Sequence, residues 1–364
     1  MDALTTPSNW QKVRLGDILS YEQPTKYLVA TTQYLQKGFT PILTAGKTFI
    51  LGYTNDKHGI YTNIPVIIFD DFTTDSKMVN FPFKIKSSAI KILSLRDNNQ
   101  ADLKYIYEKL TLLKHQVTDH KRYWIDEFSD FEIPLPPLDE QIAIANILSD
   151  VDHYLYSLDA LILKKESVKK ALSFELLSQR KRLKGFNQAW QRVRLGDICE
   201  ITTGSLDANE MVHYGKYRFY TCAKEYYFID KYAFDTEAIL ISGNGAYVGY
   251  VHYYKGKFNA YQRTYVLDNF SEHIIFVKYF LTMFLQSHIQ TNRNEGNTPY
   301  IVMATLKDFE ILLPPLNEQI AIANILSGLD SEIISLKNKK RQFENIKKAL
   351  NHDLMSAKIR VLKN

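Results

Sequence analysis

The chain has 364 residues, of which 45% are hydrophobic and 23% charged, and its formal net charge is +5. This composition indicates a globular protein with room for two or three domains and excludes a disordered chain. The mild net charge does not by itself indicate a nucleic-acid-binding protein. Cys199 and Cys222 are too few for a disulfide framework, and no apolar run is long enough to span a membrane. We therefore expect a cytoplasmic protein with no membrane segment.

Residues 1–134 show the mixed pattern of an α/β (α+β) block. The sequence WQKVRLGDI opens it at Trp10–Ile18. The run IPVIIFDDF (64–72) predicts a strand, and DLKYIYEKLTLLKHQ (102–116) predicts a helix. AGKT at 45–48 resembles the end of a phosphate-binding loop, but a proline replaces the glycine that such a loop needs. A turn before a strand is the better interpretation.

A long helix is predicted over 135–184, because Pro136 and Pro137 suit a helix start and acidic residues follow in the first turn. Apolar residues then recur with alternating spacings of four and three, which is typical of a coiled-coil seam. Lys165 and Lys169 interrupt this seam, and could extend to solvent or mark a frayed turn. The alternative is an amphipathic helix packed on its own domain. The predicted seam residues are Ile144, Leu148, Val151, Leu155, Leu158, Ile162, Leu172 and Leu176.

Residues 185–312 form a second block, opened by WQRVRLGDI at Trp190–Ile198. The sequence AILISGNGAYVGYVHYY (238–254) predicts strands, and its glycines at 243–249 indicate a hairpin loop, since no helix follows to hold a phosphate. SEHIIFVKYFLTMFLQSH (271–288) predicts a helix. The second block therefore repeats the mixed pattern of the first.

The C-terminal segment 313–364 predicts a second long helix. Glu310–Asp330 is identical to Glu132–Asp152 at 17 of 21 positions. A repeat of this size indicates a domain duplication, not a solenoid. Its predicted seam residues are Ile322, Leu326, Leu329, Ile333, Leu336, Phe343, Leu350 and Leu354.

Charges favour antiparallel pairing of the two helices. Each helix is acidic near its start and basic near its end, so antiparallel pairing sets opposite charges side by side, whereas parallel pairing stacks like charges. The acidic residues are Asp150, Asp152, Asp330 and Glu332. The basic residues are Arg180, Lys181, Arg182, Lys184, Lys358, Arg360 and Lys363.

No catalytic, cofactor-binding or metal-binding motif is found. The nine histidines show no ligand spacing. The two Pro-Pro pairs differ from an amino-methyltransferase loop, because leucine precedes and follows both where a polar acceptor and an aromatic residue are needed. We expect a non-catalytic chain.

Together, the paired blocks, the WQ-x-VRLGDI openings and the LPPL-x-EQIAIANILS repeats resemble the DNA-specificity subunit of Type I restriction–modification enzymes. The resemblance covers essentially the whole chain. It implies two target recognition domains, each contacting one half of a bipartite site in double-stranded DNA, and an antiparallel coiled coil that spaces them. It also implies docking of two methyltransferase (modification) subunits, through which restriction/translocase subunits join. S-adenosylmethionine, ATP and magnesium are then expected in the partner subunits and not in this chain.

Residues that contact DNA are predicted from their chemistry and from the loops expected to hold them. Gln262 and Arg263 rank first, because such side chains pair with adenine and guanine edges and their counterparts in the first block are Ser88 and Ala89. The remaining candidates, all expected in loops or turns, are Asn244, Lys224, Lys47, Thr73, Thr74 and Lys77. Two other classes stay open: a coiled-coil adaptor or protein-binding scaffold without DNA specificity, and an enzyme acting alone. Sequencing methylated adenines with and without the gene separates these classes.

Overall fold

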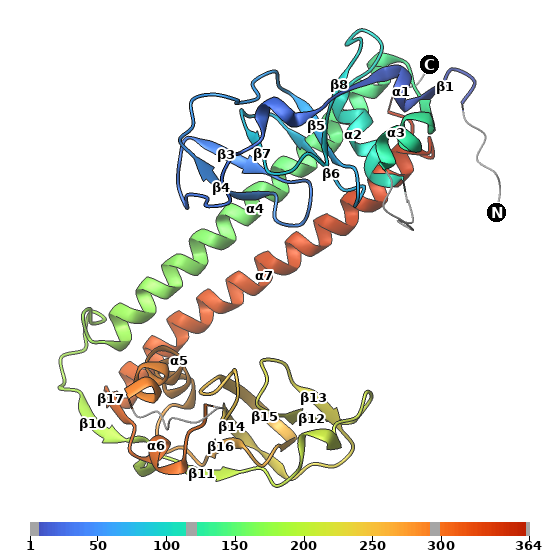
Figure 1. Ribbon diagram of the computed structural model, residues 1–364. Coiled ribbons are helices and arrows are strands. Elements are labelled where there is room, and N and C mark those ends of the chain that lie inside the picture. The colour runs from blue at the N-terminus through green and yellow to red at the C-terminus, as the bar shows by residue number, and fades with distance from the viewer. Residues whose placement is uncertain (1–6, 114–121, 292–298, 362–364) are drawn as a thin grey trace. The chain divides into compact units, whose positions relative to one another are not determined.

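The computed structural model divides the chain into two compact units (Figure 1). Unit 1 comprises residues 1–159 and 339–364, and unit 2 comprises residues 160–338. Each unit contains one block of mixed helices and strands and a part of each long helix, so the predicted fold class is confirmed. The residues that the structure describes are 7–113, 122–291 and 299–361.

The block of unit 1 contains nine strands among its described residues. They are β1 (Gln11–Arg14), β2 (Leu19–Glu22), β3 (Thr40–Leu43), β4 (Ile50–Thr54), β5 (Val66–Asp70), β6 (Ser76–Val79), β7 (Lys84–Ile85), β8 (Ile90–Leu95) and β9 (Glu132–Leu135). The helices are α1 (Leu15–Ile18), α2 (Leu103–Leu112) and α3 (Tyr123–Asp126), with short 3-10 turns η1 (Pro24–Tyr27) and η2 (Phe128–Asp130). The strands form the sheets β1-β9, β2-β8-β5-β6 and β4-β3-β7. Apolar side chains of α2, α3 and the four-stranded sheet make the main core.

The block of unit 2 is dominated by one six-stranded sheet. Its elements are β10 (Gln191–Arg194), η3 (Leu195–Asp197), β11 (Glu200–Thr203), η4 (Ala208–Glu210), β12 (Tyr217–Tyr220), β13 (Tyr227–Ile229), β14 (Phe234–Ser242), β15 (Val251–Ala260), β16 (Thr264–Asp268), α5 (Ile274–Thr291), α6 (Met303–Lys307) and β17 (Glu310–Leu313). The large sheet has the order β11-β16-β14-β15-β12-β13, and β10 pairs with β17. Apolar side chains of α5 lie in one core with those of this sheet and of the long helices.

The two blocks share a strand arrangement although their sequences have diverged. The central strands are β2-β8-β5 in unit 1 and β11-β16-β14 in unit 2, and all these neighbours are antiparallel. The opening strand of each block pairs with the strand before the long helix in the same register, Val13 opposite Ile133 and Val193 opposite Ile311. The duplication therefore extends through the blocks themselves.

The predicted elements are found, with bounds that differ from the predicted ones by a few residues. The strand predicted over 64–72 is β5, and the strands predicted over 238–254 are β14 and β15, joined by the expected glycine-containing loop. The helix predicted over 102–116 is α2, which begins after Asp102 because that side chain accepts a hydrogen bond from the Tyr105 backbone N–H. The last three residues of that prediction lie outside the described part of the chain.

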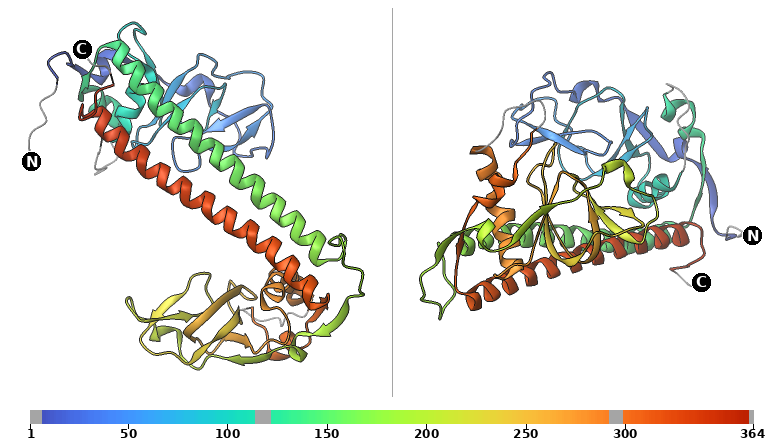
Figure 2. Two further views of the ribbon diagram at one scale, coloured as in Figure 1. Left: turned by 180° about the vertical axis from the view of Figure 1, so that it is seen from behind. Right: turned by 90° about the horizontal axis from the view of Figure 1, so that it is seen from below.

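Two forty-residue helices, α4 (Leu138–Leu177) and α7 (Leu316–Met355), begin directly after the Pro-Pro pairs. Proline lacks a backbone N–H and restricts the residue before it, which fixes both starts. In each unit the two helices lie side by side and run in opposite directions (Figure 2). For example, Asp152 pairs with Lys347 and Asp159 with Lys340 in unit 1. The expected antiparallel pairing is confirmed.

None of the predicted seam residues is exposed; each is buried or half-buried. The lysines in the seam do not fray the helix, because α4 is continuous through them, so that alternative was wrong. Their side chains stay partly exposed, at 31% for Lys165 and 27% for Lys169. Lys165 bonds Glu332 at 2.8 Å and Lys169 pairs with Asp330. Each ammonium group is paired with a carboxylate of the facing helix, which offsets part of the cost of a charge in the seam.

The helix ends are fixed by a repeated three-residue contact, here called the Trp-Glu-Arg clamp. In unit 1 Glu140 accepts hydrogen bonds from Trp10 Nε1 at 3.1 Å and from Arg360 at 2.7 and 3.1 Å. In unit 2 Glu318 accepts them from Trp190 Nε1 at 3.1 Å and from Arg182 at 3.2 and 2.6 Å. Each clamp joins a block opening, the start of one long helix and the segment after the end of the other.

The glutamine after each clamp glutamate joins the block helix to the long helix. Gln141 donates to the Pro136 carbonyl at 2.8 Å and accepts from the Asp102 backbone N–H at 3.0 Å. Gln319 makes the same two contacts with Pro314 and His273, at 2.8 and 3.0 Å. Both glutamines are fully buried, so these repeated residues serve the fold.

Candidate nucleic-acid interface

The second block gathers three loops at one end of its large sheet. Residues 221–226 follow β12, residues 243–250 join β14 to β15, and residues 261–263 join β15 to β16. The backbone N–H of Gly243 donates to the Arg263 carbonyl at 2.8 Å, which ties two of the loops together. The candidates that these loops bring together are Lys224, Asn244, Gln262 and Arg263.

The turn that holds Gln262 and Arg263 has a fixed backbone and exposed side chains. The Gln262 backbone N–H donates to the Leu206 carbonyl at 2.9 Å, and its side chain donates to Asp207 at 3.3 Å. Arg263 forms no ion pair with any residue that the structure describes. Because the turn backbone is already ordered, binding through Arg263 costs only side-chain entropy, and its planar guanidinium suits paired hydrogen bonds to a base.

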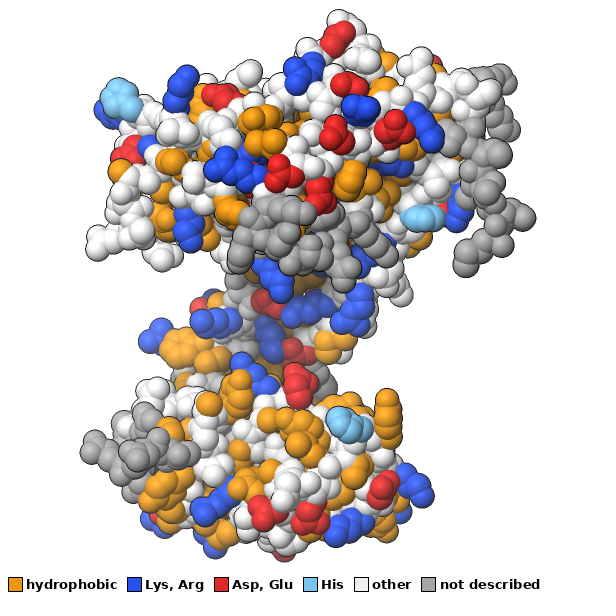
Figure 3. All heavy atoms as spheres, turned by 45° about the vertical axis from the view of Figure 1, so that its right-hand side comes forward, with side chains coloured by type: hydrophobic (Ala, Val, Ile, Leu, Met, Phe, Trp, Pro, Cys, Tyr) orange, Lys and Arg blue, Asp and Glu red, His pale blue; other side chains and the backbone are white. Residues whose placement is uncertain are grey.

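Aromatic side chains surround these loops, and sequence reasoning missed them. The Arg218 guanidinium lies 4.2 Å from the ring centre of Tyr226 and 4.4 Å from that of Tyr254, and Lys224 lies 5.2 Å from that of Tyr247. Exposed aromatic side chains in this block include Tyr226, Tyr227, Phe228, Tyr232, Tyr247 and Tyr250. The face of this block visible in Figure 3 carries many side chains of the hydrophobic class, in which the figure includes tyrosine. Cations interleaved with exposed rings favour nucleic-acid binding, and the tyrosine-rich run after Tyr217 was the available signal.

In the first block the structure separates the predicted candidates. Lys47 and Lys77 line one cleft of about 460 Å³ together with Tyr107 of α2 and His153 of α4. Lys77 lies in β6 and not in a loop, which corrects the prediction. The reason is that the turn is shorter than expected: Thr73 and Thr74 lie between β5 and β6, and Thr74 adopts a φ of 60°. Neither threonine lines the cleft.

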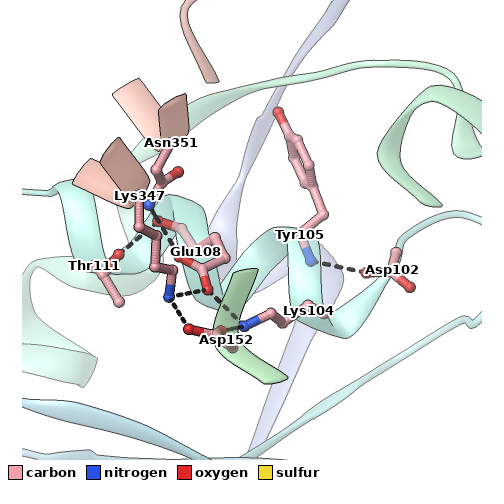
Figure 4. Close-up of polar contacts among 8 residues, drawn as sticks. All are labelled: Asp102, Lys104, Tyr105, Glu108, Thr111, Asp152, Lys347 and Asn351. Atoms are coloured by element: carbon pink, nitrogen blue, oxygen red, sulfur yellow. Dashed lines mark hydrogen bonds and ion pairs between the residues drawn. The ribbon is translucent and has the colours of Figure 1, made fainter. Parts of the chain in front are cut away.

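A buried charge network joins the first block to the long helices (Figure 4). Lys104 and Lys347 both bond Glu108, at 2.6 and 3.1 Å, and both bond Asp152 at 2.7 Å. Asn351 adds a hydrogen bond of 2.9 Å to Glu108, whose side chain is 2% exposed. Burial raises the pKa of Asp152, but the hydrogen bonds from Lys104 and Lys347 outweigh it and hold that pKa below its usual value. Asp152 therefore stays charged at neutral pH, and the network fixes α2 on both helices.

Unit 2 keeps half of this network and replaces the other half. The pair of Lys169 and Asp330 corresponds to that of Lys347 and Asp152. Where α2 has Glu108, α5 has Tyr279, which donates to Asp330 at 2.6 Å. Burial, and then the bond to Asp330, raises the pKa of Tyr279. The contacts between the two long helices are thus duplicated, whereas the contact from the block is specific to each unit.

Lys109 gives unit 1 a predicted pH dependence of stability. Its ammonium donates to the Met355 carbonyl at 2.9 Å, and burial lowers its pKa from 10.5 to about 8. Between these values the unfolded chain holds a proton that the folded chain has lost, so the free energy of unfolding should rise with pH, by up to about 3 kcal/mol. We expect urea unfolding at pH 7.5–10.5 to show this rise in the wild type and not in Lys109→Met. The matched control, Lys12→Met at an exposed site, should keep it; a wild type and Lys109→Met that change in parallel would contradict the prediction.

Some of the repeated residues are not buried. Leu138, Ile142 and Asn146 are spaced by four, so they share one face of α4. Ile142 is 42% exposed and its counterpart on α7, Ile320, is 39% exposed. We call these two sets the repeated faces: Leu138, Ile142 and Asn146 on α4, and Leu316, Ile320 and Asn324 on α7.

Two negative observations apply to the described part of the chain. None of its helices combines the length and apolar character needed to cross a membrane. Its His, Cys, Asp and Glu side chains form no group of three or more arranged to hold a metal ion. Burial raises the pKa of the Cys199 thiol to about 12, so this cysteine stays protonated at neutral pH and is a poor nucleophile.

Comparison with known proteins finds one domain twice in the chain. The family described as "Type I restriction modification DNA specificity domain" matches residues 7–165 and 187–345. The chain is 50% identical over 151 residues to the EcoR124I/EcoR124II specificity subunit of Escherichia coli, which covers 40% of this chain and 37% of that protein. It is 40% identical over 162 residues to the EcoDI specificity subunit of Escherichia coli, covering 44% and 35%. It thus matches little more than a third of these two relatives' own length.

A more distant relative and two solved structures match over nearly the full chain. The MjaVIII specificity subunit of Methanocaldococcus jannaschii is 25% identical, with 99% of this chain and 95% of that protein covered. The S subunit of a Type-I restriction-modification system from M. genitalium has a TM-score of 0.69 at 18% identity, covering 96% and 97%. A structure described as showing complex assembly and conformational transition of the type I R-M system has a TM-score of 0.53 at 16% identity, covering 96% and 98%. These structural likenesses show the fold.

Proposed function

Since the chain belongs to the Type I restriction–modification DNA specificity family, we propose that it is the sequence-specific DNA-recognition subunit of such a complex. Each block contacts one half of a bipartite site in double-stranded DNA, and the paired helices space the two halves. One observation carries the proposal: the blocks share strand order and register but differ in the side chains at matched loop positions. Gln262 and Arg263 stand where the first block has Ser88 and Ala89. Two half-sites of different sequence require this difference.

In this proposal the chain supplies recognition, and the chemistry lies in its partners. Two modification (methyltransferase) subunits bind it, and restriction/translocase subunits join through them. S-adenosylmethionine, ATP and magnesium are then bound by those partners. The support is the name that the curated relatives bear, specificity subunit, together with the duplicated surface of this chain.

The repeated faces are the proposed docking sites for the two modification subunits. The repeated segment 132–152 contains buried residues that the fold requires, such as Glu140 and Gln141. The fold does not explain why Ile142 and Ile320 are also identical, because both are exposed. The same exposed face occurs in both units, although the sequences of the two blocks have diverged. Two identical faces fit two copies of one partner.

The test of the function is a map of methylated adenines in a host with the gene, without it and with it restored. A bipartite methylated motif should appear only when the gene is present. A motif that persists without the gene, or no bipartite motif in any strain, would refute the proposed function.

Arg263→Ala should relax one base position in one half of that motif. A paired arginine–guanine contact contributes about 1–3 kcal/mol of discrimination, so affinity for the cognate site should fall about ten- to one-hundred-fold. A phosphate contact would instead weaken every sequence alike and reduce the salt dependence of binding. Binding of the assembled complex to the cognate site and to all single-base variants of it distinguishes these cases.

The matched control for that experiment is Arg192→Ala. Arg192 belongs to the same block, but its side chain is 71% exposed and pairs with Glu310 on the β10–β17 sheet, away from the loop cluster. It should leave the motif and the affinity unchanged. Uniform weakening by Arg263→Ala, or no effect, shows that Arg263 does not contact a base.

A further inference from the structure

The first block has a small recess with a buried ion pair at its floor. Its volume is about 200 Å³, and its lining includes Gln23, Ser88, Arg122, Asp71 and Lys91. Lys91 Nζ lies 2.8 Å from Asp71 Oδ2, and each side chain is 2% exposed. Asp71 Oδ1 accepts from the Trp124 backbone N–H at 2.8 Å, so both oxygens of this buried carboxylate have a partner.

The ion pair also sets the orientation of Gln23. Lys91 Nζ donates to Gln23 Oε1 at 3.3 Å. An ammonium group can only donate, so the oxygen of this amide faces Lys91 and its NH₂ group faces away from the floor. Gln23, Ser88 and Arg122 are exposed at the mouth. Gln23 and Arg122 therefore offer N–H donors there, above a floor whose charges cancel.

The matched place in the second block has different chemistry. Lys91 on β8 lies opposite Phe69 of β5, as Tyr265 on β16 lies opposite Ile241 of β14. Tyr265 therefore occupies the position of Lys91. Gly243 occupies the position of Asp71, because the two residues make the same backbone contact. The Gly243 N–H donates to the Arg263 carbonyl at 2.8 Å, and the Asp71 N–H donates to the carbonyl of its counterpart, Ala89, at 2.9 Å.

Glycine is required in the second block by close contacts. A Cβ on Gly243 would lie 2.3 Å from the Arg263 carbonyl oxygen and 2.9 Å from Cε2 of Tyr265, so no aspartate fits there. Tyr265 donates its hydroxyl to the Ile301 carbonyl at 3.0 Å. The second block thus has a tyrosine where the first has an ion pair, and a projecting Arg263 where the first has Ala89. The two blocks differ at this site in shape and in charge.

We infer that this recess is the base-contacting site of the first block, with Gln23 and Arg122 as the contacting residues and the Asp71–Lys91 pair as a positioning device. The inference rests on the proposed function. The N–H donors of Gln23 and Arg122 select a base edge with acceptors, and guanine presents two adjacent ones, O6 and N7, in the major groove. Gln23 cannot use its amide in the paired adenine contact while Lys91 holds the oxygen. The first half-site should therefore contain a guanine contacted by Gln23.

The experiment uses the assembled complex and DNA carrying 7-deazaguanine, which lacks the N7 acceptor, at each guanine in turn. The first half-site is the one that Arg263→Ala leaves unchanged. One 7-deazaguanine in it should weaken binding about ten- to one-hundred-fold in the wild type and add nothing in Gln23→Ala. Gln23→Glu, which replaces donors by acceptors, should shift the preference at that position toward cytosine, whose N4 donates. Gln33→Ala, an exposed glutamine of the same block, is the control and should behave as wild type.

The positioning role is tested by exchanging the pair rather than breaking it. The double variant Asp71→Gly with Lys91→Tyr carries the residues of the second block, so no charge is left buried alone. It should assemble normally and keep the second half-site, but lose discrimination at the same position as Gln23→Ala. A first half-site without guanine, or a motif unchanged in Gln23→Ala, overturns this inference alone. A wild-type complex that leaves no bipartite mark overturns the proposed function and the inference with it.

Discussion

The double variant Ile142→Asp and Ile320→Asp is expected to lose both modification subunits and all methylation of the bipartite motif. Each isoleucine lies at the centre of a repeated face, and both are exposed in this chain, so the substitutions leave its core intact. In the complex each would place a carboxylate against apolar surface without a partner. Losing a buried isoleucine costs about 1.5–3 kcal/mol, and the unpaired charge adds to this, so affinity should fall at least about a hundredfold per site.

Single variants make this prediction sharper, because the two faces lie in different units. Ile142→Asp or Ile320→Asp alone should leave one modification subunit bound, a stoichiometry that native mass spectrometry of the mixed subunits measures directly. The matched controls are Ile334→Asp and Ile346→Asp. These isoleucines of α7 are 58% and 50% exposed and lie outside the repeated segment 310–330. These controls should assemble fully. A double variant that still binds two modification subunits would show that the repeated faces are not the docking sites.

The second large effect is expected from Glu318→Ala in the Trp-Glu-Arg clamp of unit 2. The Glu318 side chain is fully buried and accepts from both Arg182 and Trp190. Removing it leaves a partly buried guanidinium without its carboxylate, which costs about 3–5 kcal/mol. This is a large part of the roughly 5–15 kcal/mol that stabilises a folded domain. The start of α7 and the segment after α4 should therefore unfold together.

Hydrogen exchange resolved along the chain measures this effect, because it reports the opening free energy of each segment separately. Amides at the start of α7 should exchange faster in Glu318→Ala. Glu310→Ala is the matched control: it makes the same change in the same unit, but its ion pair with Arg192 is exposed and contributes at most about 1 kcal/mol. Glu140→Ala should reproduce the effect in unit 1 through Trp10 and Arg360. Equal protection in Glu318→Ala and Glu310→Ala would contradict the assigned role of the clamp.

Sequence periodicity predicted the long helices and their direction of pairing because both depend on local patterns. Four-three spacing places apolar side chains on one stripe of a helix wherever the chain goes, and prolines stop backbone hydrogen bonding wherever they stand. The seam residues from Ile144 to Leu176 and from Ile322 to Leu354 are accordingly buried or half-buried. Partner choice was not predicted, since Arg182 pairs with Glu318 and Lys169 with Asp330 across more than 130 residues of chain.

The candidate interface was only partly predictable for the same reason. Loop residues such as Gln262 and Arg263 were found because turn positions and side-chain chemistry are visible in the sequence. Arg218 was missed, because the rings that enclose it, Tyr226 and Tyr254, belong to a different loop and a different strand. Lys91 was missed because a lysine in an apolar strand gives no sign of its partner, Asp71.

The amino-acid sequence was enough to show that the chain is a duplication, that each half joins a mixed block to a long helix, and which family it resembles. Those conclusions follow from repeated residues and from the local periodicity of apolar side chains. The tertiary structure alone separated the repeated residues into two kinds: Glu140 and Gln141 are buried in contacts that build the fold, whereas Ile142, the next residue, is exposed. It also placed Asp71 and Lys91 of the first block where the second has Gly243 and Tyr265. Burial and pairing depend on which distant segments meet, and folding brings those segments together.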